Sequence, residues 1–261
     1  FALVIASFSV FTFLSHSDFN PITEKKQHLS LSPQEEIGLG LKSAPEMVQQ
    51  YGGEASTDVS GETKVRETGD EIVAKSAASK TPYKFNFHLL ADNKTVNAFA
   101  LPGGQVFITE GLYKLLSTRG QLAGVLGHEI GHVVARHSAQ QIAKQELTQG
   151  LTGAAVIATY DPNDRNSANT AAVAAMIGSV VNMKFGRTDE LEADKLGVRF
   201  LSEAGYDPND MIKVMEILQK VGTTRTPEFF STHPNPDHRI QQIKKEVEQR
   251  YPNGIPAGMR K

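Results

Sequence analysis

Apolar positions recur mainly at the spacing of an α-helix, and residue type marks several helix boundaries. Ser32 can cap a helix whose first position is Pro33, and Glu35 completes a capping box. The glycine pair that follows Tyr51 ends this helix. The same pattern predicts further helices over the approximate ranges 59–79, 118–147, 188–205, 208–221 and 235–250.

Two stretches between the second and third of these helices show the alternation of a β-strand instead. In YKFNFHLLAD the apolar residues Phe85, Phe87 and Leu89 alternate with polar ones. The segment TVNAFALPGGQVFITEG is typical of a strand, a glycine-rich turn and a second strand. We therefore predict a mostly helical α+β fold with one small antiparallel sheet in the first half of the chain.

The beginning of the sequence differs from the rest. Residues 1–14 are nearly all apolar and residues 15–17 are small or polar, which favours an export signal or an N-terminal anchor. The alternative is a buried first helix. We expect residues 18–31 to be a linker and residues 32–255 to form the main domain. No other stretch reaches the roughly 20 apolar residues that a bilayer-spanning helix needs.

Composition narrows the chemistry. The chain of 261 residues has no cysteine, which excludes disulfides, thiolate metal ligands and a cysteine nucleophile. A formal net charge of −2 gives no reason to expect nucleic acid as a partner. We therefore look for chemistry that histidines and carboxylates can perform.

The stretch LAGVLGHEIGHVVARH places two histidines one turn apart in an otherwise apolar helix. His128 and His132 therefore present two imidazoles to one point, which suits a tetrahedral zinc ion. Glu129 lies beside that point, where a carboxylate can take a proton from water, as in the HExxH motif of zinc metallopeptidases. Gly127 and Gly131 indicate that another element packs close to this helix. The alternative is a pair of core histidines satisfied by hydrogen bonds.

A catalytic zinc ion usually has three protein ligands and one open position, so a third ligand must come from elsewhere. The segment GRTDELEADKLG offers Glu190, Glu192 and Asp194 on an expected helix. Glu190 and Asp194 share a face, so one can bind zinc while the other hydrogen-bonds a ligand imidazole. Glu192 points away from Glu190, and spacing alone leaves open which side faces the metal. Without the histidine motif, a solvated acidic helix start would be the better interpretation.

The segments VNAFALPGG, HEIGH, DELEAD, AGYDP and STHPNPDHRI occur in this order between residues 82 and 239. Together they resemble the zinc metallopeptidase family of the CAAX prenyl endopeptidase and the bacterial HtpX, BepA and LoiP proteases. The resemblance implies a zincin-like fold in which the NAFALP strand is the edge of the sheet beside the active-site helix. An extended substrate would pair with that edge through main-chain hydrogen bonds.

The resemblance also implies roles for single residues. Glu190 would be the third zinc ligand, with Asp194 as its hydrogen-bonding or proton-handling partner. His233 would lie near the metal, where it would stabilise the oxyanion or, in a resting state, occupy the open metal position. Arg239 would orient the same loop. The alternative for His233 is a turn residue before Pro234.

These features predict a metalloendopeptidase with one Zn²⁺ per chain that cleaves extended or misfolded proteins. We expect it in the periplasm or cell envelope, in protein quality control, with its N-terminus near the membrane and a protein or peptide as substrate. One rival is a zinc-stabilised, chaperone-like module that binds unfolded chains. Another is a zinc hydrolase acting on a non-peptide amide.

Two further features carry weaker signals. Residues 150–181 combine small apolar residues with a polar centre, which favours a lid over the cleft or, equally, an ordinary helical hairpin. The remaining histidines lack metal-ligand spacing, and we interpret them as surface or structural residues: His16, His28, His88, His137 and His238.

Overall fold

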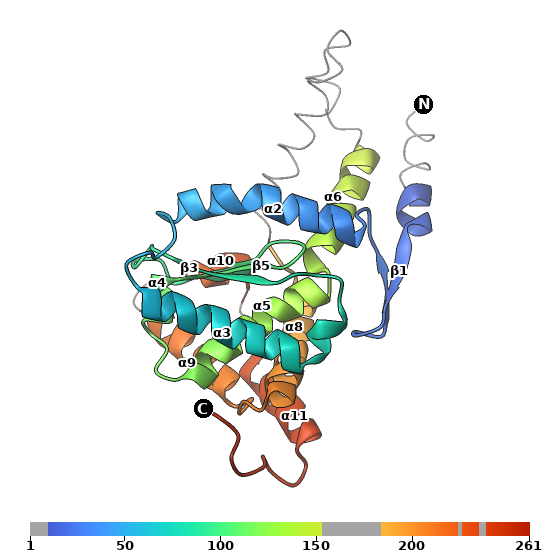
Figure 1. Ribbon diagram of the computed structural model, residues 1–261. Coiled ribbons are helices and arrows are strands. Elements are labelled where there is room, and N and C mark those ends of the chain that lie inside the picture. The colour runs from blue at the N-terminus through green and yellow to red at the C-terminus, as the bar shows by residue number, and fades with distance from the viewer. Residues whose placement is uncertain (1–9, 153–183, 224–225, 235–238) are drawn as a thin grey trace.

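The computed structural model describes residues 10–152, 184–223, 226–234 and 239–261. Within these ranges helices predominate and two small sheets are present (Figure 1), which confirms the α+β prediction. The helices are α2 (Pro33–Gln50), α3 (Val59–Lys75), the 3₁₀ helix η1 (Ala77–Lys80), α4 (Glu110–Tyr113), α5 (Arg119–Val134), α6 (His137–Thr152), α8 (Arg187–Ala204), α9 (Asp210–Gly222), α10 (Phe229–Thr232) and α11 (Arg239–Arg250). The strands are β1 (Ser17–Asn20), β2 (Lys25–His28), β3 (Asn86–Leu90), β4 (Ala98–Ala100) and β5 (Gln105–Thr109).

The central sheet has the strand order β3-β5-β4 and is mixed, whereas we expected it to be antiparallel. β4 and β5 form the predicted hairpin, with Ala98 opposite Ile108, but β3 pairs with β5 in parallel. The difference arises between β3 and β4, where Asp92 accepts hydrogen bonds from the backbone of Lys94 and Thr95. The chain reverses direction at this turn, and β4 lies on the other side of β5 from β3. The strands β3 and β4 are therefore the two edges of the sheet.

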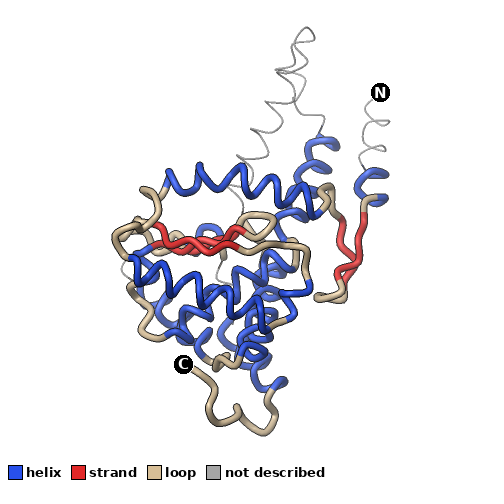
Figure 2. The backbone as a smooth tube through the Cα atoms, viewed as in Figure 1, coloured by secondary structure: helices blue, strands red, loops and turns tan. Residues whose placement is uncertain are grey.

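Helices cover both faces of this sheet (Figure 2). α2 lies on one face, α3 and α5 lie on the other, and α8 and α9 pack against the far side of α5. Glycine at position 103 allows the β4–β5 turn to reach α2, since its φ is +79° and a Cβ there would lie 2.4 Å from Ile37 Cα. The sheet and α5 therefore share one apolar core, with α5 at its centre.

Several helix boundaries follow the residue types. Ser32 and Glu35 form the predicted capping box of α2, and Gly205 ends α8 with a φ of +82°. Others are shifted: α8 begins one residue before Thr188, and α9 begins at Asp210 because Pro208 and Asn209 form a turn. The residues expected to open the last helix, 235–238, lie outside the described residues, as does His238.

The helix predicted over 118–147 is divided into α5 and α6. Arg136 lies between them with a φ of +57°, a left-handed conformation that a non-glycine residue seldom adopts. Its guanidinium donates hydrogen bonds to Glu36 on α2, to Asp18 on β1 and to the carbonyl oxygen of Leu31. These three contacts hold the break in place, and the helical period of the sequence carries no sign of them. The helix predicted over 59–79 likewise ends early, at Lys75.

The stretch that we expected to be a linker, 18–31, contains most of the hairpin formed by β1 and β2. Two buried polar side chains of the hairpin hydrogen-bond to the body, and Ile22 in its turn packs against the apolar core. Asn20 Nδ2 donates to the carbonyl oxygen of Val134 and Gln27 Nε2 to that of Ala135, each at 2.7 Å. The stretch is folded as a hairpin, and the division of the chain into a linker over 18–31 and a main domain over 32–255 stays a prediction.

Two sequence predictions remain predictions. Residues 10–15 are helical, and the role of residues 1–17 as an export signal or anchor is not decided by that conformation. Most of the segment 150–181, the expected lid or helical hairpin, lies outside the described residues. In the part of the chain that the structure describes, no helix has the length and apolar character needed to cross a bilayer.

Candidate metal centre

Helix α5 carries the HExxH motif and is buried along almost its whole length. The Nε2 atoms of His128 and His132 lie 3.1 Å apart, so both imidazoles point to one place. Glu129 is fully buried, and neither of its carboxylate oxygens has a hydrogen-bond partner among the described residues. A buried carboxylate without hydrogen bonds is unfavourable in a protein interior, which indicates a site for a cation or a reacting group.

Glycines bring α8 close to α5, as the sequence predicted for some neighbouring element. A Cβ on Gly131 would lie 2.9 Å from the carbonyl oxygen of Ala193, and one on Gly127 would lie 2.4 Å from Leu201 Cδ1. Both neighbouring residues belong to α8. The close approach of the two backbones carries the acidic residues of α8 to the histidines of α5.

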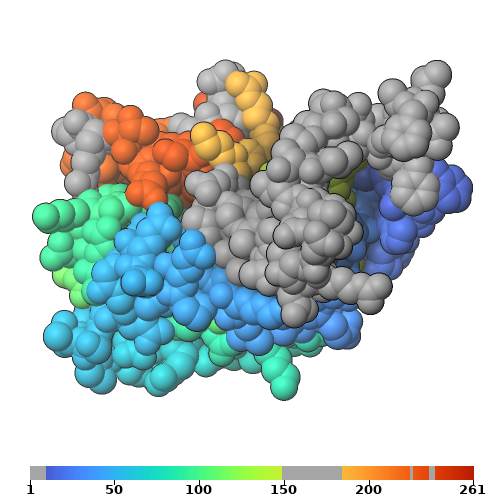
Figure 3. Space-filling model, turned by 90° about the horizontal axis from the view of Figure 1, so that it is seen from above, coloured from blue at the N-terminus to red at the C-terminus, as the bar shows by residue number. Residues whose placement is uncertain are grey.

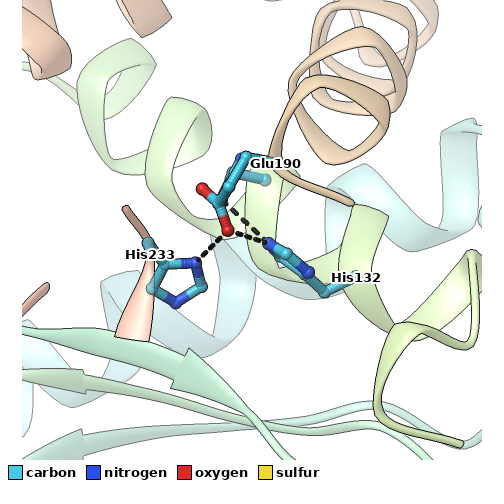
Figure 4. A group of neighbouring side chains, drawn as sticks. His132, Glu190 and His233 are labelled. Atoms are coloured by element: carbon cyan, nitrogen blue, oxygen red, sulfur yellow. Dashed lines mark hydrogen bonds and ion pairs between the residues drawn. The ribbon is translucent and has the colours of Figure 1, made fainter. Parts of the chain in front are cut away.

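Glu190 is the carboxylate of α8 that reaches both imidazoles. Its Oε1 lies 3.4 Å from His132 Nε2, and its Oε2 lies 3.5 Å from His128 Nε2. Figure 4 shows Glu190 between the rings of His132 and His233. Glu192 points to another side of α8, where it contacts His137. The rotation of α8 thus decides between the two carboxylates, which the spacing could not do.

Asp194 and Arg239 support this cluster. The Oδ1 atom of Asp194 lies 2.9 Å from His128 Nδ1, the ring nitrogen that faces away from the cluster. Arg239 donates from Nε to Asp194 Oδ2 at 2.6 Å, and its Nη1 lies 2.9 Å from Glu190 Oε2. Arg239 therefore ties the two carboxylates of α8 together, besides holding the start of α11.

His233 lies inside the cluster rather than beside it. Its Nδ1 lies 3.0 Å from Glu190 Oε1, and its Nε2 lies 3.7 Å from Glu129 Oε1. The ring stacks on Phe229 with a centroid distance of 4.4 Å. Two backbone hydrogen bonds fix this segment, from Phe229 N to Val96 O beside the edge strand β4 and from Phe185 N to Thr232 O. His233 is thus fully buried and is more than a turn residue before a proline.

The electrostatics of the cluster follow from burial and from Arg239. Burial raises the pKa of Glu129, so its carboxyl holds a proton more readily than an exposed glutamate. Burial lowers the pKa of His132, which favours a neutral imidazole with a free lone pair. Burial alone would raise the pKa of Glu190, but the charges of His233 and Arg239 outweigh it and hold that pKa well below its usual range.

The donor set fits a divalent metal ion. Ligand atoms of His128, His132, Glu190 and His233 all lie within 4.8 Å of one another, and all four residues are buried. Imidazole nitrogen and carboxylate oxygen are ligands that zinc accepts. Core histidines satisfied by hydrogen bonds would account for the contacts with Glu190, but not for the carboxylate of Glu129 beside them, which has no hydrogen-bond partner among the described residues.

The sequence reasoning missed one group behind the cluster. His137 Nδ1 lies 2.9 Å from His132 Nδ1, and His137 Nε2 lies 3.3 Å from Glu192 Oε2. Glu192 Oε1 in turn lies 2.8 Å from Lys25 Nζ on β2. His137 is a structural histidine, as expected, but it touches a candidate ligand directly. A spacing of five residues from His132 does not predict contact on a continuous helix, and the sequence does not reveal the break at Arg136.

The fold and the site define the class: this is a metallopeptidase of the HExxH type, with the motif helix beside the edge of a small sheet. Comparison of the sequence with known protein families agrees with this class, since the sequence model of peptidase family M48 matches residues 60–247. The chain belongs to peptidase family M48, which confirms the resemblance that the sequence motifs indicated.

Two kinds of curated relative are similar to this chain. The beta-barrel assembly-enhancing protease of Escherichia coli strain K12 is 31% identical over 195 residues, which are 72% of this chain and 39% of that protein. The mitochondrial metalloendopeptidase OMA1 of Schizosaccharomyces pombe is 30% identical over 250 residues, which are 94% of this chain and 70% of that protein. The chain therefore spans well under half the length of the first relative and about two thirds of the second.

Proposed function

We propose that the protein is a zinc-dependent metalloendopeptidase that hydrolyses peptide bonds in extended or misfolded protein chains. His128, His132 and Glu190 would hold one Zn²⁺, a ligand set of two histidines and a carboxylate that is common in catalytic zinc sites. The observation that carries this proposal is the convergence of their ligand atoms beside the carboxylate of Glu129, which has no hydrogen-bond partner among the described residues. Membership of peptidase family M48 supports it.

Glu129 would act as the proton-transferring residue. When bound, zinc would polarise the scissile carbonyl group and lower the pKa of a water molecule in the site to about 7. The raised pKa of Glu129 makes its carboxylate a stronger base, which suits it to take the proton of that water. Glu129 would then pass the proton to the leaving amine. Asp194 would accept the Nδ1 hydrogen of His128 and so fix its tautomer.

His233 would stabilise the negative charge that develops on the carbonyl oxygen. Removal of one such donor typically lowers kcat by about 10²–10³-fold. In this structure the Nδ1 atom of His233 contacts Glu190 instead. This contact supports the resting arrangement that the family resemblance implies, in which His233 occupies the open metal position.

The edge strand β4 would bind the substrate. β4 pairs with β5 on one side, and it packs against both α5 and α10. A substrate chain that adds to this edge would be selected mainly by its main-chain hydrogen bonds, so extended and unfolded segments are the expected substrates. Folded proteins offer few such segments, which fits a role in protein quality control.

The same proposal places the protein in the periplasm or cell envelope. The apolar segment at residues 1–14 supports export or anchoring, and the beta-barrel assembly-enhancing proteases among its relatives support an envelope role. Fractionation of cells that produce the full precursor would test this location. Recovery in the cytosol alone would contradict it.

Glu129→Gln tests the mechanism. The amide keeps the size of the side chain but cannot accept the proton, so casein hydrolysis should fall by about 10²–10⁴-fold while zinc content stays near one ion per chain. The measurements are metal analysis and casein digestion, each with and without a chelator. Glu67→Gln, an exposed site on α3, is the matched control. Full hydrolysis by Glu129→Gln would refute the mechanism.

One observation favours the chaperone-like alternative. Glu129, Glu190 and His233 have no exposed surface in this structure, so the cluster as it stands is closed to a substrate. A zinc-stabilised binding module would suppress the aggregation of an unfolded protein, and Glu129→Gln would leave that activity unchanged. The same pair of proteins used for casein digestion therefore separates the two functions.

A further inference from the structure

A line of polar contacts leads from the candidate ligand His132 to the N-terminal hairpin. It passes from His132 to His137, from His137 to Glu192 and from Glu192 to Lys25, at 2.9, 3.3 and 2.8 Å. We call these four residues the hairpin relay. Exposure rises along it: the side chain of His137 is fully buried, while that of Lys25 is 61% exposed. The relay therefore connects the buried cluster with a surface strand.

The contacts assign one hydrogen to each of the two imidazole rings. His132 Nε2 faces Glu190 and His128, so a metal would be bound through that atom and His132 Nδ1 would carry the hydrogen. His137 Nδ1 must then accept this hydrogen bond, which leaves the hydrogen of His137 on Nε2, where Glu192 accepts it. In this arrangement each ring N–H of the relay has an acceptor.

The break between α5 and α6 makes this arrangement possible. In a continuous helix, a residue five positions later lies about 140° around the axis, so its side chain would point away from His132. The left-handed conformation of Arg136 redirects the chain and returns the ring of His137 to that of His132, at a centroid distance of 4.9 Å. The break is therefore part of the site's geometry.

The hairpin holds the break from outside. Two of its side chains cap the C-terminal end of α5: Asn20 and Gln27 donate hydrogen bonds to the carbonyl oxygens of Val134 and Ala135. Asp18 on β1 also accepts a hydrogen bond from Arg136. The hairpin thus contacts the backbone at the end of the motif helix through its own side chains. Through the hairpin relay it is also connected to the Nδ1 side of the His132 ring.

We propose that His137 is a positioning residue for the metal site and that the N-terminal hairpin completes this site through Glu192 and Lys25. This inference rests on the metal site of the proposed function. His137 holds the Nδ1 hydrogen of His132 and so aims Nε2 at the metal, as Asp194 does for His128. Outer partners of this kind typically change metal affinity by about 10–100-fold when they are removed.

The test measures the Kd for Zn²⁺ of the full chain by competition with a fluorescent chelator at equilibrium. His137→Phe keeps a ring but removes the acceptor, and its Kd should rise by about 10-fold or more. His137→Asn places an oxygen near the former Nδ1 and should recover most of the affinity. His88→Phe is the matched control, since His88 also pairs with a carboxylate, Glu54, and stacks on the ring of Phe107, which is not one of the cluster residues.

A second pair of variants tests the hairpin itself. Lys25→Met removes the charge that holds Glu192 and should weaken zinc binding measurably, though less than His137→Phe, because Lys25 is largely exposed. Lys26→Met is its control, since neighbouring strand residues point to opposite faces. The visible absorption of the cobalt(II)-loaded protein reports ligand geometry, and it should change in His137→Phe and stay constant in both controls.

The outcomes separate the inference from the proposed function. An unchanged Kd in His137→Phe, or an equal loss in His88→Phe, would overturn the relay. If His137→Phe does not fold, equal affinities of Lys25→Met and Lys26→Met would overturn the role of the hairpin. A wild-type chain that binds zinc but never cuts casein refutes the peptidase proposal alone, whereas one that binds no zinc refutes both.

Discussion

Arg239 shows how one side chain can hold a cluster of charges in a protein interior. It is 2% exposed and contacts both Asp194 and Glu190, and their proximity raises its pKa further despite burial. A buried carboxylate without a partner is strongly unfavourable. Arg239 therefore compensates the negative charge of α8 as long as no metal does so.

Arg239→Met should accordingly destabilise the metal-free protein by about 3–5 kcal/mol, because two buried carboxylates lose their cation. The loss should be smaller with zinc present, since the metal ion would then neutralise Glu190. Urea unfolding in chelator and in excess zinc measures both values. Arg199→Met, which breaks a partly exposed pair with Glu203, should change stability by at most about 1 kcal/mol. An equal loss with and without zinc would contradict this account.

At the scale of single residues, the sequence predicts which residues form the site better than it predicts which residues they contact. His128, Glu129 and His132 follow from a fixed spacing on one helix. The choice of Glu190 over Glu192 depends on how α8 is rotated against α5, and only the family resemblance could supply it in advance. The role of Glu192 at His137 depends on a helix break that no local pattern marks.

The packing of α5 against α8 sets the position of the whole site. Gly131 allows this contact, and its missing Cβ would meet backbone atoms of Ala193. Gly38 on α2 offers a comparison, since a Cβ there would meet nothing within 4 Å. The absence of a side chain is therefore required for packing at Gly131 but not at Gly38.

Gly131→Ala should destabilise the protein by about 1–3 kcal/mol, because backbone atoms of α8 must move to admit the methyl group. Gly38→Ala should be neutral or stabilising by up to about 1 kcal/mol, since alanine favours the helix and nothing opposes it. Chemical unfolding of both variants measures the contrast. A stable Gly131→Ala protein would show that the two helices can separate without cost.

At the scale of elements, helix ends with chemical markers were predictable. Ser32, Glu35 and Gly205 act as the sequence indicates. The break at Arg136 has no glycine or proline, and three distant partners hold it, so local rules could not reveal it. The parallel pairing of β3 with β5 was equally hidden, because strand orientation depends on how the chain crosses the sheet.

Seen from above, α2 lies along the molecular surface next to residues from the C-terminal part of the chain (Figure 3). The last described residues return to the body elsewhere, where Arg260 stacks over the ring of Tyr206 and donates a hydrogen bond to Glu71 on α3 at 2.8 Å. The hydrogen bond from Arg260 is the main cause that lowers the pKa of Glu71 to about 2. This contact joins the end of the chain to its first half.

A lowered carboxyl pKa stabilises the folded state above the unfolded value of 4.5 and loses that effect as the pH falls toward about 2. Arg260→Gln should therefore reduce the unfolding free energy by about 1 kcal/mol at neutral pH, and the deficit should shrink below pH 4.5. Urea unfolding between pH 7 and pH 3 measures it. Arg250→Gln, whose partner Glu203 is 3.7 Å away, should show no such trend. A deficit that is constant with pH would contradict the assignment.

The segments that attach to the body by polar contacts were the least predictable part of the molecule. The hairpin of β1 and β2 and the segment ending at Arg260 have little apolar periodicity, so the sequence predicts a linker over 18–31 and no helix or strand after the last helix. Their order comes from hydrogen bonds to backbone carbonyls and to Glu71 that lie far away in the sequence.

The complete burial of the cluster has a kinetic consequence. A chelator could reach a metal ion held by His128 and Glu190 only after part of the surrounding structure had moved aside, since neither side chain is more than 3% exposed. Ion exchange would then proceed at the frequency of that motion, whatever the concentration of the competitor. The rate of zinc loss from this protein would then measure how often the site opens. The affinity for zinc would have to be determined at equilibrium, since a slow rate of loss would not by itself mean a low Kd.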